Sequence, residues 1–186
     1  MLVGEKVILE EIDPANIEQL RKWRNDPLIR KYFREYKDIT VDEQVKWYHE
    51  RGNNSDKSFV YFQITHTHKP LGGSVLLGCC GLTGIDFRLR KAELSIFLGS
   101  GRGEGNGMDA LKLLFDYGFK ELNLHKIFAE VYDNNEALRI YKKLGMAEDG
   151  ILRDSYFHEG RYGNSIMLSM LEDEWRNKYG DKPLWK

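Results

Sequence analysis

The sequence has little cysteine and no long hydrophobic run. Its two cysteines, Cys79 and Cys80, are neighbours in a predicted strand, where adjacent side chains point to opposite faces, so a disulfide between them would be strained. The longest apolar stretch, Ser74 to Leu82, is too short to span a bilayer and is interrupted by glycine. The first residues, Met1 to Glu11, contain no apolar signal core. These absences predict a cytoplasmic chain with reduced thiols and no membrane span.

The chain also lacks an excess of charge of either sign. Its 28 Lys and Arg residues nearly balance its 29 Asp and Glu residues, which leaves a formal net charge of −1. This balance offers no broadly basic surface for nucleic acid or for an anionic membrane. A length of 186 residues with 41% hydrophobic residues suits one globular domain with a substantial core, and no internal repeat or linker divides it.

Glycine, in contrast, is concentrated in one segment, where Gly101, Gly103, Gly105 and Gly107 alternate with other residues. The preceding stretch, Ala92 to Gly99, is predicted as a strand, and the residues that follow have the apolar spacing of an amphipathic helix. The first amides of a helix have no partner within it and carry the positive end of its dipole. Glycines let the backbone adopt positive φ and approach an anion closely. The segment therefore predicts a phosphate or pyrophosphate site.

Two common phosphate loops are excluded by the details of this segment. A P-loop requires Lys and then Ser or Thr after its last glycine, whereas Gly107 is followed by Met108 and Asp109, and no register supplies GxGxxG. The pattern Arg-x-x-Gly-x-Gly, from Arg102 through Gly105 to Gly107, resembles the acetyl-CoA pyrophosphate loop of the GCN5-related N-acetyltransferases (GNAT). Taken alone, the same glycines also fit a flexible loop before a surface helix.

A second motif further along the chain strengthens this resemblance. In the family, the helix after the next strand starts with Asn, has a small residue three positions later and Tyr seven positions later. Here these positions hold Asn134, Ala137 and Tyr141, followed by Leu-Gly-Met where the family has Leu-Gly-Phe. With both motifs in this order, the chain is identified as a member of the GNAT family from about Lys6 to Leu171. The segment Asn-Leu-His-Lys-Ile before the strand is typical of the branch with ribosomal-protein and spermidine N-acetyltransferases.

The resemblance implies a single-domain α/β fold of the α+β type, with the N-acetyltransferase domain at residues 1–171 and a polar tail at 172–186. The chain predicts a mixed, mostly antiparallel sheet of six to seven strands with flanking helices. The crossover through the glycine loop joins parallel neighbours. In the family these two strands splay apart and the pantetheine arm lies between them.

Helix starts are predicted from capping boxes, in which a side chain and the residue three positions later satisfy each other's backbone amides. Thr40 with Glu43 has this spacing, and so has Asp133 with Glu136. Gly145 stands where a glycine commonly ends a helix.

The resemblance assigns acetyl-CoA, with no metal, to a defined set of residues. The amides from Gly103 to Gly107 hold the pyrophosphate with charge added by Arg102, and an amide near Phe97 or Leu98 polarises the thioester carbonyl. The full set is Phe97, Leu98, Arg102, Gly103, Glu104, Gly105, Asn106, Gly107, Asn134, Ala137 and Tyr141. Glu104 departs from the family, where this position is often basic, so its side chain is expected to face solvent while its amide binds; reduced CoA affinity is the alternative.

Acetyl transfer also requires groups that move protons. The matching family tyrosine, here Tyr141, protonates the departing CoA thiolate, and packing on the apolar face of its helix is the alternative role. Glu93 is the first candidate for the base that deprotonates the amine, since it lies on the strand leading to the acetyl site; an ion-paired side chain is its alternative. His125 and His158 are weaker candidates, and many relatives use a water chain.

The acceptor side is expected to be built from the first helices and the last hairpin. Its candidate residues offer aromatic walls and hydrogen-bond donors, and they are Trp23, Arg24, Asn25, Tyr32 and Phe33, with Arg34 as a further donor. A similar stretch occurs in acetyltransferases that act on amino-sugar nucleotides, although aromatic residues of an amphipathic helix are commonly core. The carboxylates between Glu35 and Glu43 suit a polycation such as spermidine, or are solvated helix charges.

The sequence therefore predicts acetyl transfer from acetyl-CoA to a primary amine in a direct ternary complex. A small amine or amino sugar is the first acceptor, a protein N-terminus the second and a polyamine the third. A CoA-binding sensor without turnover and a nucleotide-binding protein are the competing classes. An acetyl-cysteine route is disfavoured because Cys79 and Cys80 are expected on a core strand away from the motifs. Relatives are often dimers, which leaves a homodimer open, and no nucleic-acid or membrane partner is expected.

Overall fold

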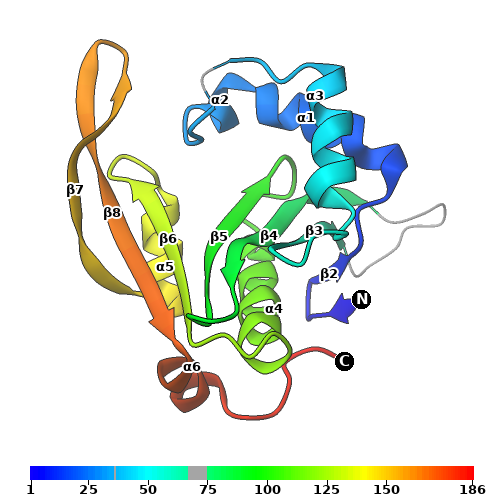
Figure 1. Cartoon of the computed structure of the whole chain (residues 1–186), viewed down its shortest axis with the longest axis vertical. Helices are drawn as coiled ribbons and strands as arrows, with labels where there is room; N and C mark the ends of the chain where they lie inside the picture. The colour runs from blue at the N-terminus through cyan, green and yellow to red at the C-terminus, as the bar shows by residue number, and fades with distance from the viewer. Residues whose placement is uncertain (36, 67–74) are drawn as a thin grey trace.

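An eight-stranded sheet runs through residues 1–35, 37–66 and 75–186, the parts of the chain that the computed structural model describes (Figure 1). Its strands are β1 (Leu2–Val3), β2 (Val7–Glu10), β3 (Phe59–His66), β4 (Leu76–Asp86), β5 (Lys91–Leu98), β6 (Lys126–Tyr132), β7 (Ala147–His158) and β8 (Arg161–Leu171). They are ordered β1-β2-β3-β4-β5-β6-β8-β7, and every neighbouring pair except β5 with β6 is antiparallel. The predicted architecture is confirmed. The sheet has one strand more than the six to seven predicted, and this is β1, whose two residues are too few to show a periodicity.

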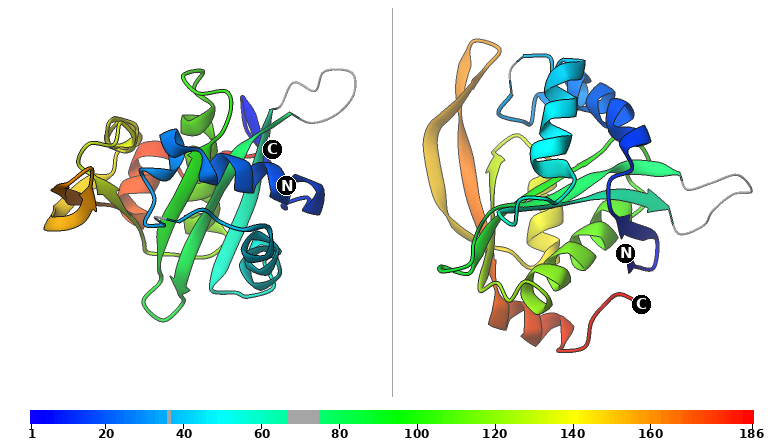
Figure 2. Two further views of the ribbon diagram at one scale, coloured as in Figure 1. Left: turned by 90° about the horizontal axis from the view of Figure 1, so that it is seen from above. Right: turned by 45° about the vertical axis from the view of Figure 1, so that its right-hand side comes forward.

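Helices cover both faces of the sheet (Figure 2). They are η1 (Pro14–Asn16), α1 (Ile17–Asn25), α2 (Pro27–Arg30), α3 (Val41–Trp47), η2 (Tyr48–Gly52), α4 (Asn106–Lys120), α5 (Ala137–Leu144) and α6 (Glu172–Tyr179). No helix in the described part of the chain has the length and apolar character needed to cross a bilayer. α1 to α3 lie over one face and α4 and α5 over the other, so the sheet separates two layers of side chains.

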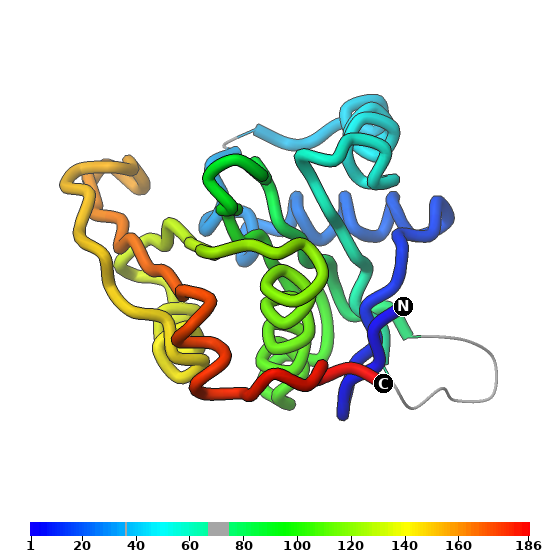
Figure 3. The backbone as a smooth tube through the Cα atoms, turned by 60° about the horizontal axis from the view of Figure 1, so that its bottom comes forward, coloured from blue at the N-terminus to red at the C-terminus, as the bar shows by residue number. Residues whose placement is uncertain are grey.

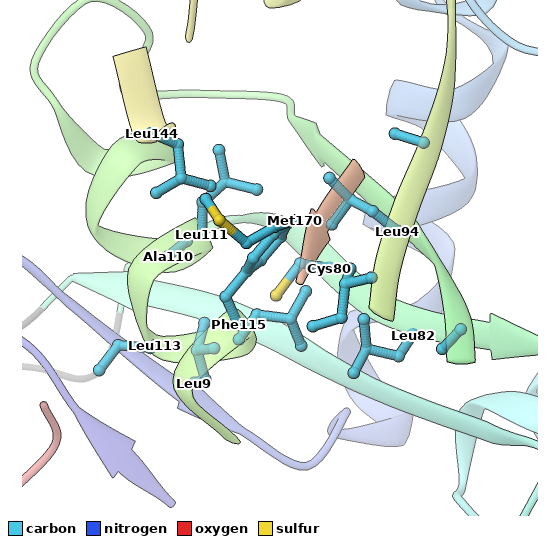
Figure 4. Packing of buried hydrophobic residues seen from close by; sticks show 14 of the residues in the cluster. Leu9, Cys80, Leu82, Leu94, Ala110, Leu111, Leu113, Phe115, Leu144 and Met170 are labelled. Atoms are coloured by element: carbon cyan, nitrogen blue, oxygen red, sulfur yellow. The ribbon is translucent and has the colours of Figure 1, made fainter. Parts of the chain in front are cut away.

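The main core lies between α4 and the sheet (Figure 4). The apolar face of α4 buries Phe115 and Phe119 completely or nearly so, against strand residues such as Leu82. Gly118 permits this close approach, because a Cβ there would lie 2.9 Å from Leu82 Cδ1 and 2.8 Å from Ile127 Cδ1. α4 is therefore fixed on the sheet, with its N-terminus at the end of β5.

A smaller core lies on the opposite face, under α1 and α3. Leu20 of α1 is 1% exposed and packs with Tyr61 and Cys79 of the sheet. The Trp23 ring lies against Gly99, where an added Cβ would be 1.8 Å from Trp23 Cδ2. This layer holds α1 directly over the end of β5.

β5 and β6 separate soon after they begin to pair. Their parallel pairing is limited to Lys91 with Lys126, Ala92 with Ile127 and Glu93 with Phe128. β6 continues alongside β8 to Tyr132, and β5 continues alongside β4 to Leu98, so the two strands diverge (Figure 1). This confirms the splayed parallel pair.

The predicted helix caps are confirmed in part. Thr40 and Glu43 form the capping box of α3, and Gly145, at φ 114°, ends α5. The box predicted between Asp133 and Glu136 is wrong, because α5 begins only at Ala137. The Asp133 carboxylate instead accepts hydrogen bonds from the Tyr156 hydroxyl and the Asn164 amide, since β6 ends beside the β7–β8 hairpin.

The C-terminal residues pack against the rest of the chain and contain one short helix, α6. Trp175 of α6 is fully buried, and its indole nitrogen donates a 2.8 Å hydrogen bond to the buried carboxylate of Asp116. The same carboxylate accepts from the Leu184 amide at 2.6 Å and lies 2.6 Å from the Lys120 ammonium. The two ends of the chain lie side by side (Figure 3).

Candidate active site

A cleft with a volume of about 1460 Å³ opens where β5 and β6 diverge. It extends from the layer of α1 to α3, across the sheet, to the glycine loop and α5. Its lining includes Arg24, Tyr32, Phe33, Glu35, Trp47, Tyr61, Glu93, Phe97, Leu98, Arg102, Gly103, Gly105, Gly107, Glu130, Ala137 and Tyr141. Both motifs found in the sequence therefore contribute to one cavity.

The glycine loop has the conformation expected of an anion site. Gly103 and Gly105 have φ of 83° and 87°, and Gly105 caps α4. The Asp109 amide donates to the Gly105 carbonyl, so the amides of Asn106, Gly107 and Met108 precede the first helical hydrogen bond. These amides and the positive end of the α4 dipole suit the phosphates of CoA.

Two polar residues of this loop support its shape. The Asn106 side chain is 1% exposed and donates to the Gly101 carbonyl at 3.0 Å and to the Glu104 carboxylate at 3.3 Å. Glu104 is exposed, as expected, and is not among the residues lining the cleft. We infer that Asn106 stabilises the loop, while the Glu104 carboxylate is directed away from the cleft.

Lys6, which the sequence did not indicate, lies beside the loop. Its ammonium donates a 2.6 Å hydrogen bond to the Glu104 carbonyl, and a Cβ on Gly105 would lie 3.3 Å from that ammonium. The positive charge of the Lys6 ammonium offsets the negative charge that the Glu104 carboxylate brings to the loop. Lys6 precedes β2, far from the loop in sequence, and neither motif includes it.

The register of β5 distinguishes the two amides considered for the thioester carbonyl. The Gly99 amide donates to the Leu77 carbonyl at 2.8 Å, and hydrogen-bonding direction alternates along an antiparallel pair. The Phe97 amide therefore faces β4, whereas the Leu98 amide faces the opening towards β6. The Arg102 side chain also reaches this end of β5, because its Nε donates a 2.8 Å hydrogen bond to the Leu98 carbonyl.

We expect Gly105→Val to weaken CoA binding by about tenfold, which corresponds to about 1.4 kcal/mol. A β-branched residue at φ 87° is strained by roughly 1–2 kcal/mol, so the loop would leave the conformation that presents the α4 amides. Titration calorimetry with CoA measures the change. Gly150→Val is the control, because an added Cβ there meets nothing within 4 Å. An unchanged Kd in Gly105→Val would contradict this account of the loop.

Tyr141 projects from α5 to the cleft and is only 8% exposed. Burial raises the pKa of its phenol above the usual value of 10, so the hydroxyl stays protonated throughout the neutral range. Ala137 also lines the cleft, but Asn134 does not: it is exposed in the turn before α5. Its neighbour Asn135 lines the cleft instead and accepts a hydrogen bond from the Ala137 amide.

Glu93 lies at the fork between β5 and β6, where it is ion-paired. Arg34 Nη2 is 2.6 Å from Glu93 Oε1 and 2.8 Å from Glu130 Oε2. The pKa of Arg34 is raised, mainly by its hydrogen bond to Glu93. The sequence indicated Arg34 as a hydrogen-bond donor on the acceptor side but not as a partner of Glu93, and it did not indicate Glu130. His125 and His158 are absent from the described lining.

The acceptor candidates divide into two groups. Arg24, Tyr32 and Phe33 line the cleft, with the Arg24 guanidinium 4.1 Å from the Phe33 ring centre. Trp23 and Asn25 are not among the lining residues: Trp23 packs in the smaller core, and both polar atoms of the Asn25 side chain bond to Ile39 at 2.8 Å. These two residues therefore support the packing of α1 and of the segment at Ile39 and do not line the cleft.

The expectation that both cysteines lie away from the motifs is wrong for Cys79. Cys79 pairs with Phe97 across β4 and β5 and lines the cleft, because its side chain faces the layer of α1 and α3. Burial raises the pKa of its thiol to about 12, so the nucleophilic thiolate is scarcely populated at neutral pH. Cys80 faces the main core. Across the described ranges of the chain, no three His, Cys, Asp or Glu side chains form a group suited to a metal ion.

Comparison with known sequences places this site in context. A family profile described as "Acetyltransferase (GNAT) domain" matches residues 6–147. A spermidine N(1)-acetyltransferase of Escherichia coli K12 is 28% identical over 155 residues, which cover 72% of this chain and 83% of that protein. An uncharacterized N-acetyltransferase, p20, of Bacillus licheniformis is 25% identical over 94% of this chain and 97% of its own length.

Solved structures show the same fold. A crystal structure of spermidine N-acetyltransferase from Vibrio cholerae, in complex with CoA and spermine, superposes with a TM-score of 0.81. The two sequences are 25% identical, and the match covers 91% of this chain and 97% of the other. The shared fold therefore covers nearly the whole of both chains.

Proposed function

Because the chain belongs to the GNAT acetyltransferase family and is an acetyl-CoA-dependent N-acetyltransferase, we propose that its acceptor is a small polyamine of the spermidine class. The observation that carries this proposal is the set of carboxylates in the acceptor half of the cleft. They come from the segment after α2, from α3 and from both splayed strands, and they are Glu35, Asp38, Glu43, Glu93 and Glu130. Carboxylates on several sides suit a flexible chain that carries several ammonium groups.

The floor of this region suits the rest of such a molecule. Four aromatic side chains line the cleft here, those of Trp47, Phe59, Tyr61 and Phe97. The rings of Trp47 and Tyr61 meet edge to face, with their centres 5.0 Å apart. Methylene groups between the nitrogens of a polyamine would pack on these rings, and its ammonium groups would approach the aromatic faces or the carboxylates. The relatives that act on spermidine also support a polyamine above the amino sugar that the sequence placed first.

The chain's own residues account for the steps of transfer. Bound acetyl-CoA supplies an activated thioester. The amides at the start of α4 hold its phosphates, and the Leu98 amide donates to the thioester carbonyl, which lowers the barrier by about 3 kcal/mol by analogy with other oxyanion sites. Glu93 accepts the proton of the acceptor ammonium, directly or through water, and Tyr141 donates a proton to the departing thiolate.

A panel of amines with acetyl-CoA, followed by thiol release, tests the acceptor class. We expect spermidine and spermine to give the highest kcat/KM, ahead of an amino-sugar nucleotide and of peptides with free N-termini. A higher kcat/KM for either of the last two would overturn the polyamine proposal. CoA binding with no turnover of any amine would favour a binding protein over an enzyme.

A further inference from the structure

Arg34 bridges two carboxylates that belong to the diverging strands. It lies in the segment between α2 and α3, and its guanidinium contacts Glu93 on β5 at 2.6 Å and Glu130 on β6 at 2.8 Å. The Arg34 side chain is 61% exposed, whereas those of Glu93 and Glu130 are 26% and 20% exposed. The Arg34 guanidinium therefore comes from the layer of α1 to α3, whereas the two carboxylates belong to the sheet.

The sheet places both carboxylates on the acceptor side of the cleft. Glu93 pairs with Phe128, and Glu130 follows two positions later on β6, so the two side chains share a face. The alternate residues Ala92 and Ile127 are fully buried in the core under α4. Because β5 and β6 separate beyond Glu93, these carboxylates lie at the fork through which the acceptor reaches the thioester.

The charges of this group do not balance. Two carboxylates share one guanidinium, which leaves one negative charge in a cleft that must admit an amine. Arg34 also leaves Glu93 engaged, although Glu93 is the group proposed to accept the proton. The bridge is a resting arrangement that has to open before that proton transfer.

The segment around Arg34 has other attachments that would remain after the bridge opens. Arg24 lies 2.8 Å from Glu35, Arg30 pairs with Asp38, and the Asn25 side chain bonds to both backbone groups of Ile39. An exposed arginine regains water when it leaves its partners, so its release costs little. Breaking the ion pairs of Arg34 therefore requires movement of the Arg34 side chain only, and the layer of α1 to α3 keeps its place on the sheet.

We propose that Arg34 is an internal competitor of the acceptor, a specificity-determining residue whose guanidinium occupies the Glu93–Glu130 pair until an ammonium of the substrate replaces it. The inference rests on the proposed polyamine function. The exchange replaces one ion pair with another and forms no covalent bond. It selects cationic acceptors, because a neutral molecule has no charge with which to displace Arg34, and it frees Glu93 only when an ammonium has arrived.

The test is Arg34→Gln in the full-length protein, assayed with acetyl-CoA and spermidine. Removal of the competitor is expected to lower KM for spermidine about two- to fivefold, which is the range that an exposed ion pair can account for, with a smaller change in kcat. Methylguanidinium should then raise the apparent KM of the variant by competition, because it can refill the vacated position. It should inhibit the wild type far less, since Arg34 already fills that position. Lys46→Gln removes the same charge from an exposed pair with Glu50 and should show neither effect.

Arg34→Lys provides a second variant if Arg34→Gln folds poorly. A lysine keeps the charge but lacks the planar fork that bridges two carboxylates, so it should lower KM in the same direction by less. An unchanged or higher KM in both variants, or a lower KM without competition by methylguanidinium, would overturn this inference while spermidine turnover by the wild type upholds the proposed function. Absence of polyamine turnover by all the proteins would overturn both.

Discussion

Tyr141→Phe is expected to lower kcat about a hundredfold, which is the lower end of what general acid catalysis contributes. Tyr141 lines the same cleft as the glycine loop that we propose to hold CoA, and burial raises the pKa of its hydroxyl, so it is a proton donor and not a base. Phenylalanine preserves the packing on α5 and removes only the donor. Steady-state kinetics with acetyl-CoA and a saturating amine measures the loss, while calorimetry should show unchanged CoA binding.

Tyr162→Phe is the matched control for this change. Tyr162 lies on β8, is 67% exposed and is absent from the cleft lining, so the same substitution there should leave kcat unaltered. The sign of the Tyr141 pKa shift adds a second check. Since the folded pKa lies above 10, the wild type should not lose activity by ionisation of this phenol as the pH rises to 10. Wild-type kcat in Tyr141→Phe would reduce Tyr141 to a packing residue.

Asp116→Ala is expected to destabilise the fold by about 3–5 kcal/mol, a large share of the 5–15 kcal/mol available to a typical domain. The substitution leaves the Trp175 indole and the Leu184 amide without an acceptor and leaves the Lys120 ammonium uncompensated. The Lys120 and Asp116 side chains are only 7% and 0% exposed, so water cannot readily replace the carboxylate. Urea unfolding followed by tryptophan fluorescence measures the loss.

Asp173→Ala is a suitable control for the stability measurement. Asp173 is exposed in the first turn of α6, where a carboxylate contributes less than about 1 kcal/mol through the helix dipole. A similar loss in the two variants would show that the buried hydrogen bonds of Asp116 do not hold the C-terminal segment in place.

The parts of the fold that were predictable depend on residues close together in the chain. The glycine loop and the start of α4 follow from alternating glycines before an apolar helix, and the α3 cap from Thr40 and Glu43 three positions apart. In each case the local sequence contains all of the partners. The splayed strands are different: they were expected from the resemblance to a family, because no periodicity encodes where a parallel pair ends.

The contacts that the sequence missed are those between residues far apart in the chain. Lys6 reaches the glycine loop across 98 positions, and Arg34 reaches Glu93 and Glu130 across 59 and 96. An isolated basic residue before a strand or in a loop carries no sign of such a partner. Trp23 illustrates the converse, because an aromatic residue on an amphipathic helix has the same pattern whether it faces a cleft or a core.

The packing of the last helix has a consequence for the order in which the molecule is completed during translation. A chain is made from its N-terminus, at about 5–20 residues per second, so the sheet and α4 leave the ribosome before α6 does. Trp175 fills the core against Phe115 and Phe119. The Asp116 carboxylate accepts hydrogen bonds from the Trp175 indole and the Leu184 amide, and both donors are made after the rest of the core. The apolar face formed by Phe115 and Phe119 therefore stays uncovered in the nascent domain until α6 has been made, and a chain truncated before α6 exposes that face to chaperones and proteases.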